Sequence, residues 1–123
     1  MKRILAVDDS ASMRQMVGFT LKNAGYDVTE AKDGQEALEV AKNKEFDVII
    51  SDVNMPNMDG ITMCSKVSEN PDLKQIPIFM LTTESTIDMK EKGKKAGVKA
   101  WITKPFDDEK IVMAVDKILG LDL

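Results

Sequence analysis

Short runs of apolar residues alternate along the chain with longer segments in which apolar residues recur every three or four positions. The runs are too short for helices and are typical of buried strands. They comprise Ile4–Val7, Val48–Ile50, Ile78–Leu81 and Ala100–Ile102, with Tyr26–Ala31 as a more mixed, half-exposed strand. The alternation predicts five strands and five helices in the order βαβαβαβαβα. Because apolar strands separated by helices form parallel sheets, we expect an α/β fold with helices on both faces.

The helical segments carry boundary signals of their own. The first predicted helix has an apolar stripe at Met13, Met16, Val17, Thr20, Leu21 and Ala24, and Gly25 is placed to end it. Asp33 with Glu36 has the spacing of a capping box, and Asp59 and Asp107 are expected to cap later helices. The last helix should finish by Leu119. Five βα units indicate a doubly wound, flavodoxin-like (βα)5 sheet in a single domain, residues 1–123, without an effector domain.

Composition and charge narrow the function classes. The chain is 43% hydrophobic and 31% charged and contains no histidine, which excludes Ser-His-Asp and Cys-His catalysis and histidine-ligated zinc. The single Cys64 cannot form an internal disulfide and fits a reducing compartment. A formal charge of -4 argues against non-specific nucleic-acid binding. No apolar run is long enough for a signal peptide or a membrane span, so we expect a cytoplasmic protein.

Three aspartates lie at the predicted ends of two strands. Asp8 and Asp9 close the first strand, and Asp52 closes the third. Ligands bind doubly wound sheets outside the carboxyl ends of the strands, so these three carboxylates are expected in one crevice. Their mutual repulsion favours a bound divalent cation, and an all-oxygen site with few protein ligands suits Mg²⁺.

The later strands add a cation and a hydroxyl at the same edge. Lys104 follows the fifth predicted strand and Thr82 follows the fourth. Alone, Lys104 would be interpreted as a surface lysine and Thr82 as a helix N-cap. Together with a metal they could neutralise a phosphoryl group while the carboxylate of Asp52 attacks phosphorus to give an acyl phosphate.

Four motifs carry a resemblance to a known family. They are Val7-Asp8-Asp9-Ser10 with Met13-Arg14, the stretch from Ser51 to Gly60, Leu81-Thr82-Thr83-Glu84, and Lys104-Pro105-Phe106. The chain resembles the receiver domains of two-component response regulators over essentially its full length, and among them the stand-alone chemotaxis regulators. Each motif lies at the expected strand end, which makes the match specific.

The resemblance implies roles for the site residues. Asp52 would accept a phosphoryl group from the phosphohistidine of a kinase. Asp9 and Asp52 would ligate Mg²⁺ directly, Asp8 would act mostly through water, and the backbone carbonyl of Asn54 would complete the protein ligands. Lys104 would pair with the phosphoryl oxygens, and its peptide bond to Pro105 would be cis.

Further roles follow from the same resemblance. Thr82 would move to bond the phosphoryl group, and Trp101 would change rotamer with it. Asn54 and Glu84 occupy positions that tune the lifetime of the phosphoryl group. The chain departs from the family pattern at Trp101, where Tyr or Phe is usual, and at Ser10, where the best-known chemotaxis regulators carry Phe.

One predicted helix is strongly basic. Residues 88–99 hold five lysines against Asp88 and Glu91, a net charge of +3, in a chain whose total charge is -4. A solvated helix face is one interpretation. The other is a docking face for an acidic helix or peptide of a partner, formed by Lys90, Lys92, Lys95 and Lys99.

These features predict a phosphorylation switch rather than an enzyme. The resemblance implies a monomer that is phosphorylated by a histidine kinase of the CheA-like type and binds a flagellar motor switch protein and a phosphatase, without nucleic acid or membrane. The alternatives are a phosphate sink, another motility pathway, or a Mg²⁺-dependent phosphohydrolase. The hydrolase is disfavoured because Asp8 and Asp9 are adjacent, whereas such enzymes carry D-x-D there. In a flavodoxin-like electron carrier, the same two acids would repel a flavin phosphate.

Overall fold

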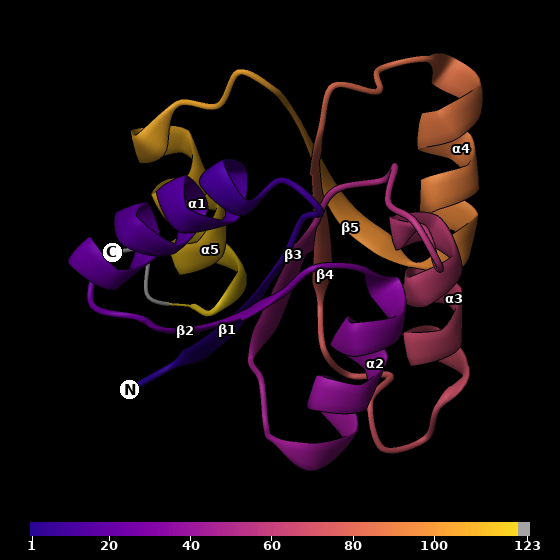
Figure 1. The fold of residues 1–123 in the computed structure, drawn as a ribbon, viewed down its shortest axis with the longest axis horizontal. Helices are drawn as coiled ribbons and strands as arrows, with labels where there is room; N and C mark the ends of the chain where they lie inside the picture. The colour runs from indigo at the N-terminus through magenta and orange to yellow at the C-terminus, as the bar shows by residue number, and fades with distance from the viewer. Residues whose placement is uncertain (121–123) are drawn as a thin grey trace.

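Five parallel strands form one sheet in the order β2-β1-β3-β4-β5, as Figure 1 shows. The computed structural model describes residues 1–120. The strands are β1 (Arg3–Val7), β2 (Asp27–Ala31), β3 (Val48–Ser51), β4 (Ile78–Thr82) and β5 (Val98–Thr103). The order reverses at β1, because β2 lies on one side of it and all later strands lie on the other. The predicted fold class is therefore confirmed.

Helices cover both faces of the sheet (Figure 1). Helices α1 (Ala11–Asn23) and α5 (Asp108–Ile118) pack on one face, and α2 (Gly34–Asn43), α3 (Gly60–Glu69) and α4 (Ile87–Ala96) pack on the other. Successive residues of β1 point to opposite faces, so Ile4 belongs to the core under α1 and α5 while Leu5 belongs to the core under the other three helices. Both are fully buried.

The predicted helix caps form. Asp33, Asp59 and Asp107 accept hydrogen bonds from the backbone N–H groups of Glu36, Thr62 and Glu109 at 2.8, 2.7 and 2.9 Å. Gly25 has φ 98°, a conformation that suits glycine just after the end of α1. These local signals could be recognised in the sequence because a cap needs only residues within one turn of each other.

Three expectations need correction. Met16 belongs to the predicted apolar stripe of α1, but it is 55% exposed, whereas Val17 and Leu21 are buried and Met13 packs partly buried against the same core. Thr82 is not a helix N-cap: it is the last residue of β4, and Thr86 caps α4. Strand β5 begins at Val98, two residues before the apolar run that predicted it.

The helices were also compared with the requirements for a membrane span. None of those within residues 1–120 combines the length and the apolar character needed to cross a bilayer.

Candidate metal and phosphoryl site

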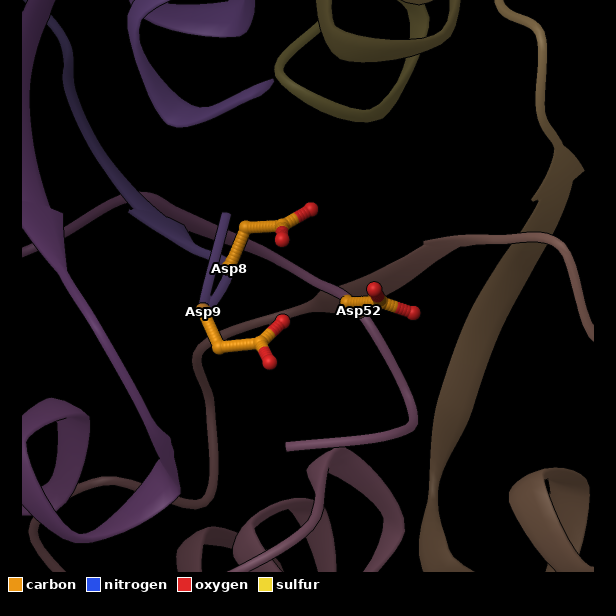
Figure 2. A group of neighbouring side chains, drawn as sticks. All are labelled: Asp8, Asp9 and Asp52. Carbon is orange, nitrogen blue, oxygen red and sulfur yellow. The ribbon is translucent and has the colours of Figure 1, made fainter. Parts of the chain in front are cut away.

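The three predicted carboxylates meet at the carboxyl ends of β1 and β3. Asp8 is buried, Asp52 is partly buried and Asp9 is exposed, and one ligand oxygen of each lies within 4.8 Å of the others. Figure 2 shows the side chains of Asp8 and Asp9 leaving the end of β1 on the side where Asp52 lies. Strand pairing places them there, since the N–H of Asp52 donates to the carbonyl of Val7 at 2.9 Å.

Lys104 completes the cluster from the other end of the chain. Its Nζ donates to Oδ2 of Asp8 at 2.8 Å and to Oδ2 of Asp52 at 3.1 Å. Burial disfavours the ammonium, but the hydrogen bonds to these two carboxylates and their negative charges together outweigh burial and raise the pKa of Lys104 above its usual value. The lysine therefore stays cationic beside the acids. The Lys104–Pro105 peptide bond is cis, as predicted.

The turn after β1 is held by contacts that the sequence did not reveal. The carbonyl oxygen of Asp8 accepts a 2.7 Å hydrogen bond from Nη1 of Arg14, whose Nε lies 3.4 Å from Oε1 of Glu30. Oδ1 of Asp8 accepts from the N–H of Ser10 at 2.9 Å. Arg14 stands in one of the family motifs, six residues after Asp8, and this spacing was the only signal for its contact.

Asp52 is fixed by its own backbone and by a close approach of α3. The N–H of Val53 donates to Oδ1 of Asp52 at 2.7 Å. A Cβ atom on Gly60 would overlap the carbonyl oxygen of Asp52, so the start of α3 can lie against this residue only with glycine there. The carboxylate is thereby presented at the end of β3 with Oδ2 directed to Lys104.

The loop after β4 joins the remaining predicted residues. The side chain of Thr82 is buried, and its hydroxyl accepts from the N–H of Glu84 at 3.2 Å. The side-chain amide of Asn54 donates to Oε1 of Glu84 at 3.1 Å, across the opening between the loops that follow β3 and β4. In this conformation Glu84 is hydrogen-bonded both to Thr82, through its backbone N–H, and to Asn54, through its side chain.

Trp101 lies on β5 next to this loop. Its Nε1 donates a 2.7 Å hydrogen bond to the carbonyl of Glu84. A Cβ on Gly93 of α4 would lie 2.8 Å from Cζ3 of the indole, so the ring occupies the space that a side chain at Gly93 would need.

The predicted partner face lies on α4 and at the start of β5. Lys90, Lys92 and Lys95 are exposed on α4, and Lys99 is exposed near the start of β5. None of the four forms an ion pair with any residue between 1 and 120. Their charges therefore face solvent in this structure.

The chemistry of the cluster fits a small divalent cation. All three side chains offer carboxylate oxygens, the ligands that Mg²⁺ prefers, and few protein ligands leave room for the waters that it keeps. Three carboxylates and the Lys104 ammonium leave a formal charge of two negatives, which one Mg²⁺ balances. Asp9 is exposed, so the cluster is open to solvent.

Comparisons with known proteins agree with this geometry. Residues 4–116 match the response regulator receiver domain. The chain is 40% identical over 120 residues to chemotaxis protein CheY1 of Helicobacter pylori, covering 96% of this chain and 97% of that protein. It is 37% identical over 117 residues to chemotaxis protein CheY-3 of Vibrio cholerae, covering 94% and 90%. The structure of Vibrio cholerae CheY4 superposes with a TM-score of 0.91 at 47% identity, covering 96% of this chain and 98% of that one. The chain therefore belongs to the response regulator receiver domain family of two-component signalling.

Proposed function

We propose that this protein is a stand-alone, phosphorylation-dependent switch in which Asp52 accepts a phosphoryl group from a histidine kinase. The observation that carries the proposal is the junction of Asp8, Asp9 and Asp52 with Lys104. Residues 96 positions apart are hydrogen-bonded there at 2.8 Å. Apolar residues would fill the same space at a lower energetic cost, so packing does not explain such a concentration of charge.

Asp9 and Asp52 would hold Mg²⁺ directly, with Asp8 acting through water and the carbonyl of Asn54 as a further ligand. When bound, the ion would neutralise charge on the phosphoryl oxygens. Lys104 would contribute a second positive charge. It is already 3.1 Å from Oδ2 of Asp52, so little rearrangement is needed for it to follow the phosphoryl group.

The transfer itself would be a substitution at phosphorus. An oxygen of the Asp52 carboxylate attacks the phosphorus of a phosphohistidine whose other ring nitrogen carries a proton, the P–N bond breaks as the P–O bond forms, and the imidazole leaves as a neutral ring that keeps that proton. The product is an acyl phosphate on Asp52. Release by water would be slow, with Asn54 and Glu84 at the opening controlling access, so the protein transfers and loses its own phosphoryl group without turning over other substrates.

The signal would leave through Thr82, Trp101 and α4. A phosphoryl oxygen competes for the Thr82 hydroxyl that now accepts from Glu84, and Glu84 also holds Trp101 by its carbonyl. Rearrangement of this loop would change the surface that includes Lys90, Lys92, Lys95 and Lys99 on and beside α4. Regulation would then be a change in partner affinity.

Phosphorylation can be tested directly. Acetyl phosphate with Mg²⁺ should add one phosphoryl group by intact mass and change the fluorescence of Trp101, the only tryptophan of the chain. The variant Asp52→Asn should lose both signals together, while Asp72→Asn, at an exposed aspartate after α3, should keep them. Phosphorylation of Asp52→Asn, or steady turnover of p-nitrophenyl phosphate by the wild type, would refute the proposal.

The similarity to named chemotaxis proteins favours a chemotaxis pathway, with a CheA-like kinase, a flagellar motor switch protein as target and a dedicated phosphatase. We place the protein in the cytoplasm, as a monomer that binds neither nucleic acid nor membrane. A role as phosphate sink or in another motility pathway would keep the same site but require no binding to the motor.

The target can be tested with the motor switch protein of the same organism. Its affinity for the phosphorylated protein should exceed that for the unmodified protein. Lys92→Glu with Lys95→Glu should weaken it at least tenfold without changing phosphorylation. The matched pair Lys42→Glu and Lys44→Glu, at the end of α2, should have little effect. Equal affinity of all variants for the motor switch protein would show that α4 is not the docking face.

A further inference from the structure

The loop between β3 and α3 is attached to the start of α2 by contacts outside the carboxylate cluster. The side-chain amide of Asn57 donates a 2.8 Å hydrogen bond to Oδ2 of Asp33. The N–H of Gly34 donates to the carbonyl of Met58 at 3.0 Å. Asn57 and Asp33 are 24 residues apart, so this is a tertiary contact between two loops at the same edge of the sheet.

Asp33 is unusually enclosed for a charged residue, with only 3% of its surface exposed. Both of its carboxylate oxygens are used, because Oδ1 accepts from the N–H of Glu36 while Oδ2 accepts from Asn57. These two hydrogen bonds, that from Glu36 first, lower the pKa of Asp33 despite its burial. The residue is thus an anion that caps α2 with one oxygen and binds the neighbouring loop with the other.

The backbone on both sides is specialised for this contact. Asn57 has φ 67°, in the left-handed region that asparagine tolerates better than most residues. Gly34 cannot carry a side chain, since a Cβ there would lie 2.6 Å from the carbonyl oxygen of Met58. A loop that merely lay on the surface would not need either residue type.

The other end of the same loop is fixed as well. The N–H of Gly60 donates to the carbonyl of Val53 at 2.8 Å, where α3 approaches Asp52. Asn54 lies between the two attachments, with its side chain bonded to Glu84. The position of the Asn54 carbonyl therefore depends on where the Asn57 end of the loop is held.

We infer that Asp33 and Asn57 are positioning residues for the metal and phosphoryl site, and that their hydrogen bond holds the β3–α3 loop where Asp52 and Asn54 together bind Mg²⁺. This inference rests on the proposed function. Neither residue touches the reacting atoms; both act through the loop. Groups that orient metal ligands typically change metal affinity by about 10–100-fold when they are removed.

Three variants distinguish the effect of the Asn57–Asp33 hydrogen bond from the effects of backbone conformation and of added charge. Asn57→Asp puts a second carboxylate against Oδ2 of Asp33 and should raise the Kd for Mg²⁺, measured by calorimetry, about tenfold. A negative charge near the site would by itself strengthen cation binding, so a loss reports displaced ligands. Adding Asp33→Asn exchanges donor and acceptor and should restore most of the affinity. Asn57→Gly keeps the left-handed backbone without the amide and should give an intermediate loss.

Hydrogen exchange of the metal-free protein provides a readout that needs neither Mg²⁺ nor phosphorylation. Amides of residues 54–58 should exchange faster in Asn57→Asp and recover in the double variant. The control is Asn70→Asp at the end of α3, where Asp can still accept the 2.8 Å hydrogen bond from the N–H of Asp72. It should keep wild-type affinity and exchange.

The outcomes of these experiments are distinguishable. If folded Asn57→Asp binds Mg²⁺ like the wild type and exchanges at the same rate, or if the double variant recovers neither property, the positioning role is refuted while phosphorylation of Asp52 stands. If the wild type is not phosphorylated, the proposed function fails, and the exchange rates of the metal-free variants still decide whether Asp33 and Asn57 hold the loop.

Discussion

The indole nitrogen of Trp101 is hydrogen-bonded to the carbonyl of Glu84 at 2.7 Å. This contact joins β5 to the loop that follows β4, and the same indole fills the space beside Gly93 of α4. One side chain therefore connects the loop at the site, the last strand and the helix that bears the basic face.

The fit between Trp101 and Gly93 predicts non-additive mutations. Gly93→Ala should destabilise the fold by about 1–3 kcal/mol, because the new methyl group meets a rigid ring. In a Trp101→Phe background the smaller ring leaves room, so the same change should be neutral or stabilise by up to about 1 kcal/mol through helix propensity. Urea unfolding of the four proteins measures this cycle. Additive effects would mean that the ring and the glycine are independent.

Removal of Lys104 should strengthen Mg²⁺ binding. The ammonium contacts Asp8 and Asp52 in the cluster that would hold the cation, and its loss removes a repulsion on the order of 1 kcal/mol, about fivefold in Kd. Lys104→Ala should also lower the metal-free melting temperature, because Asp8 is left buried without its partner. Calorimetry and thermal unfolding with and without Mg²⁺ test both effects. Lys110→Ala, an exposed lysine of α5, is the control and should change neither.

The environment of Tyr26 predicts that the free energy of unfolding decreases at alkaline pH. Burial and the hydrogen bond from its hydroxyl to Asp116 raise its pKa above the usual 10.0. The folded state therefore keeps a proton that the unfolded chain releases, so this contribution is complete below pH 10 and declines as the pH rises above it. Tyr26→Phe should cost about 1 kcal/mol at pH 7 and flatten the decline between pH 10 and 12. Denaturant melts across that range give the slopes, and parallel slopes would contradict the prediction.

The thiol of Cys64 should be unreactive in the native protein. The residue is fully buried, its Sγ lies 3.3 Å from the carbonyl of Ala96, and burial raises its pKa to about 11. At pH 8 a disulfide reagent should modify it only as fast as the protein opens. In guanidinium chloride one thiol per chain should react at once. Rapid native labelling would show that α3 and α4 separate readily.

Features that depend on neighbouring residues, or on the regular geometry of a parallel sheet, could be predicted from the sequence. The capping aspartates, the strands of β1 and β3 and the meeting of Asp8 with Asp52 followed from apolar runs and from the geometry of parallel sheets. The predicted burial of Met16 is wrong because the spacing of apolar residues in a helix gives the direction of the buried face but not its width. Thr82 was open to two interpretations because strand ends and N-caps favour the same residue type.

Contacts between polar groups far apart in sequence could not be predicted in this way. Arg14 contacts Glu30 across 16 residues, and Asn57 binds Asp33 across 24 residues; neither pairing leaves a periodic trace in the chain. These partners depend on how separate elements and loops meet once the sheet has formed. Such contacts become visible only when backbone and side-chain positions are both known.

The strand order has a consequence for how the protein gains its activity. Asp8, Asp52 and Lys104 directly follow the first, third and fifth strands, so a segment that contains all three must extend past the end of the last strand. A fragment, or a chain still emerging from the ribosome, would have aspartates but no assembled acceptor. Competence to receive the phosphoryl group would therefore arise only with the last strand in place, so that signalling would be restricted to molecules whose folding is finished.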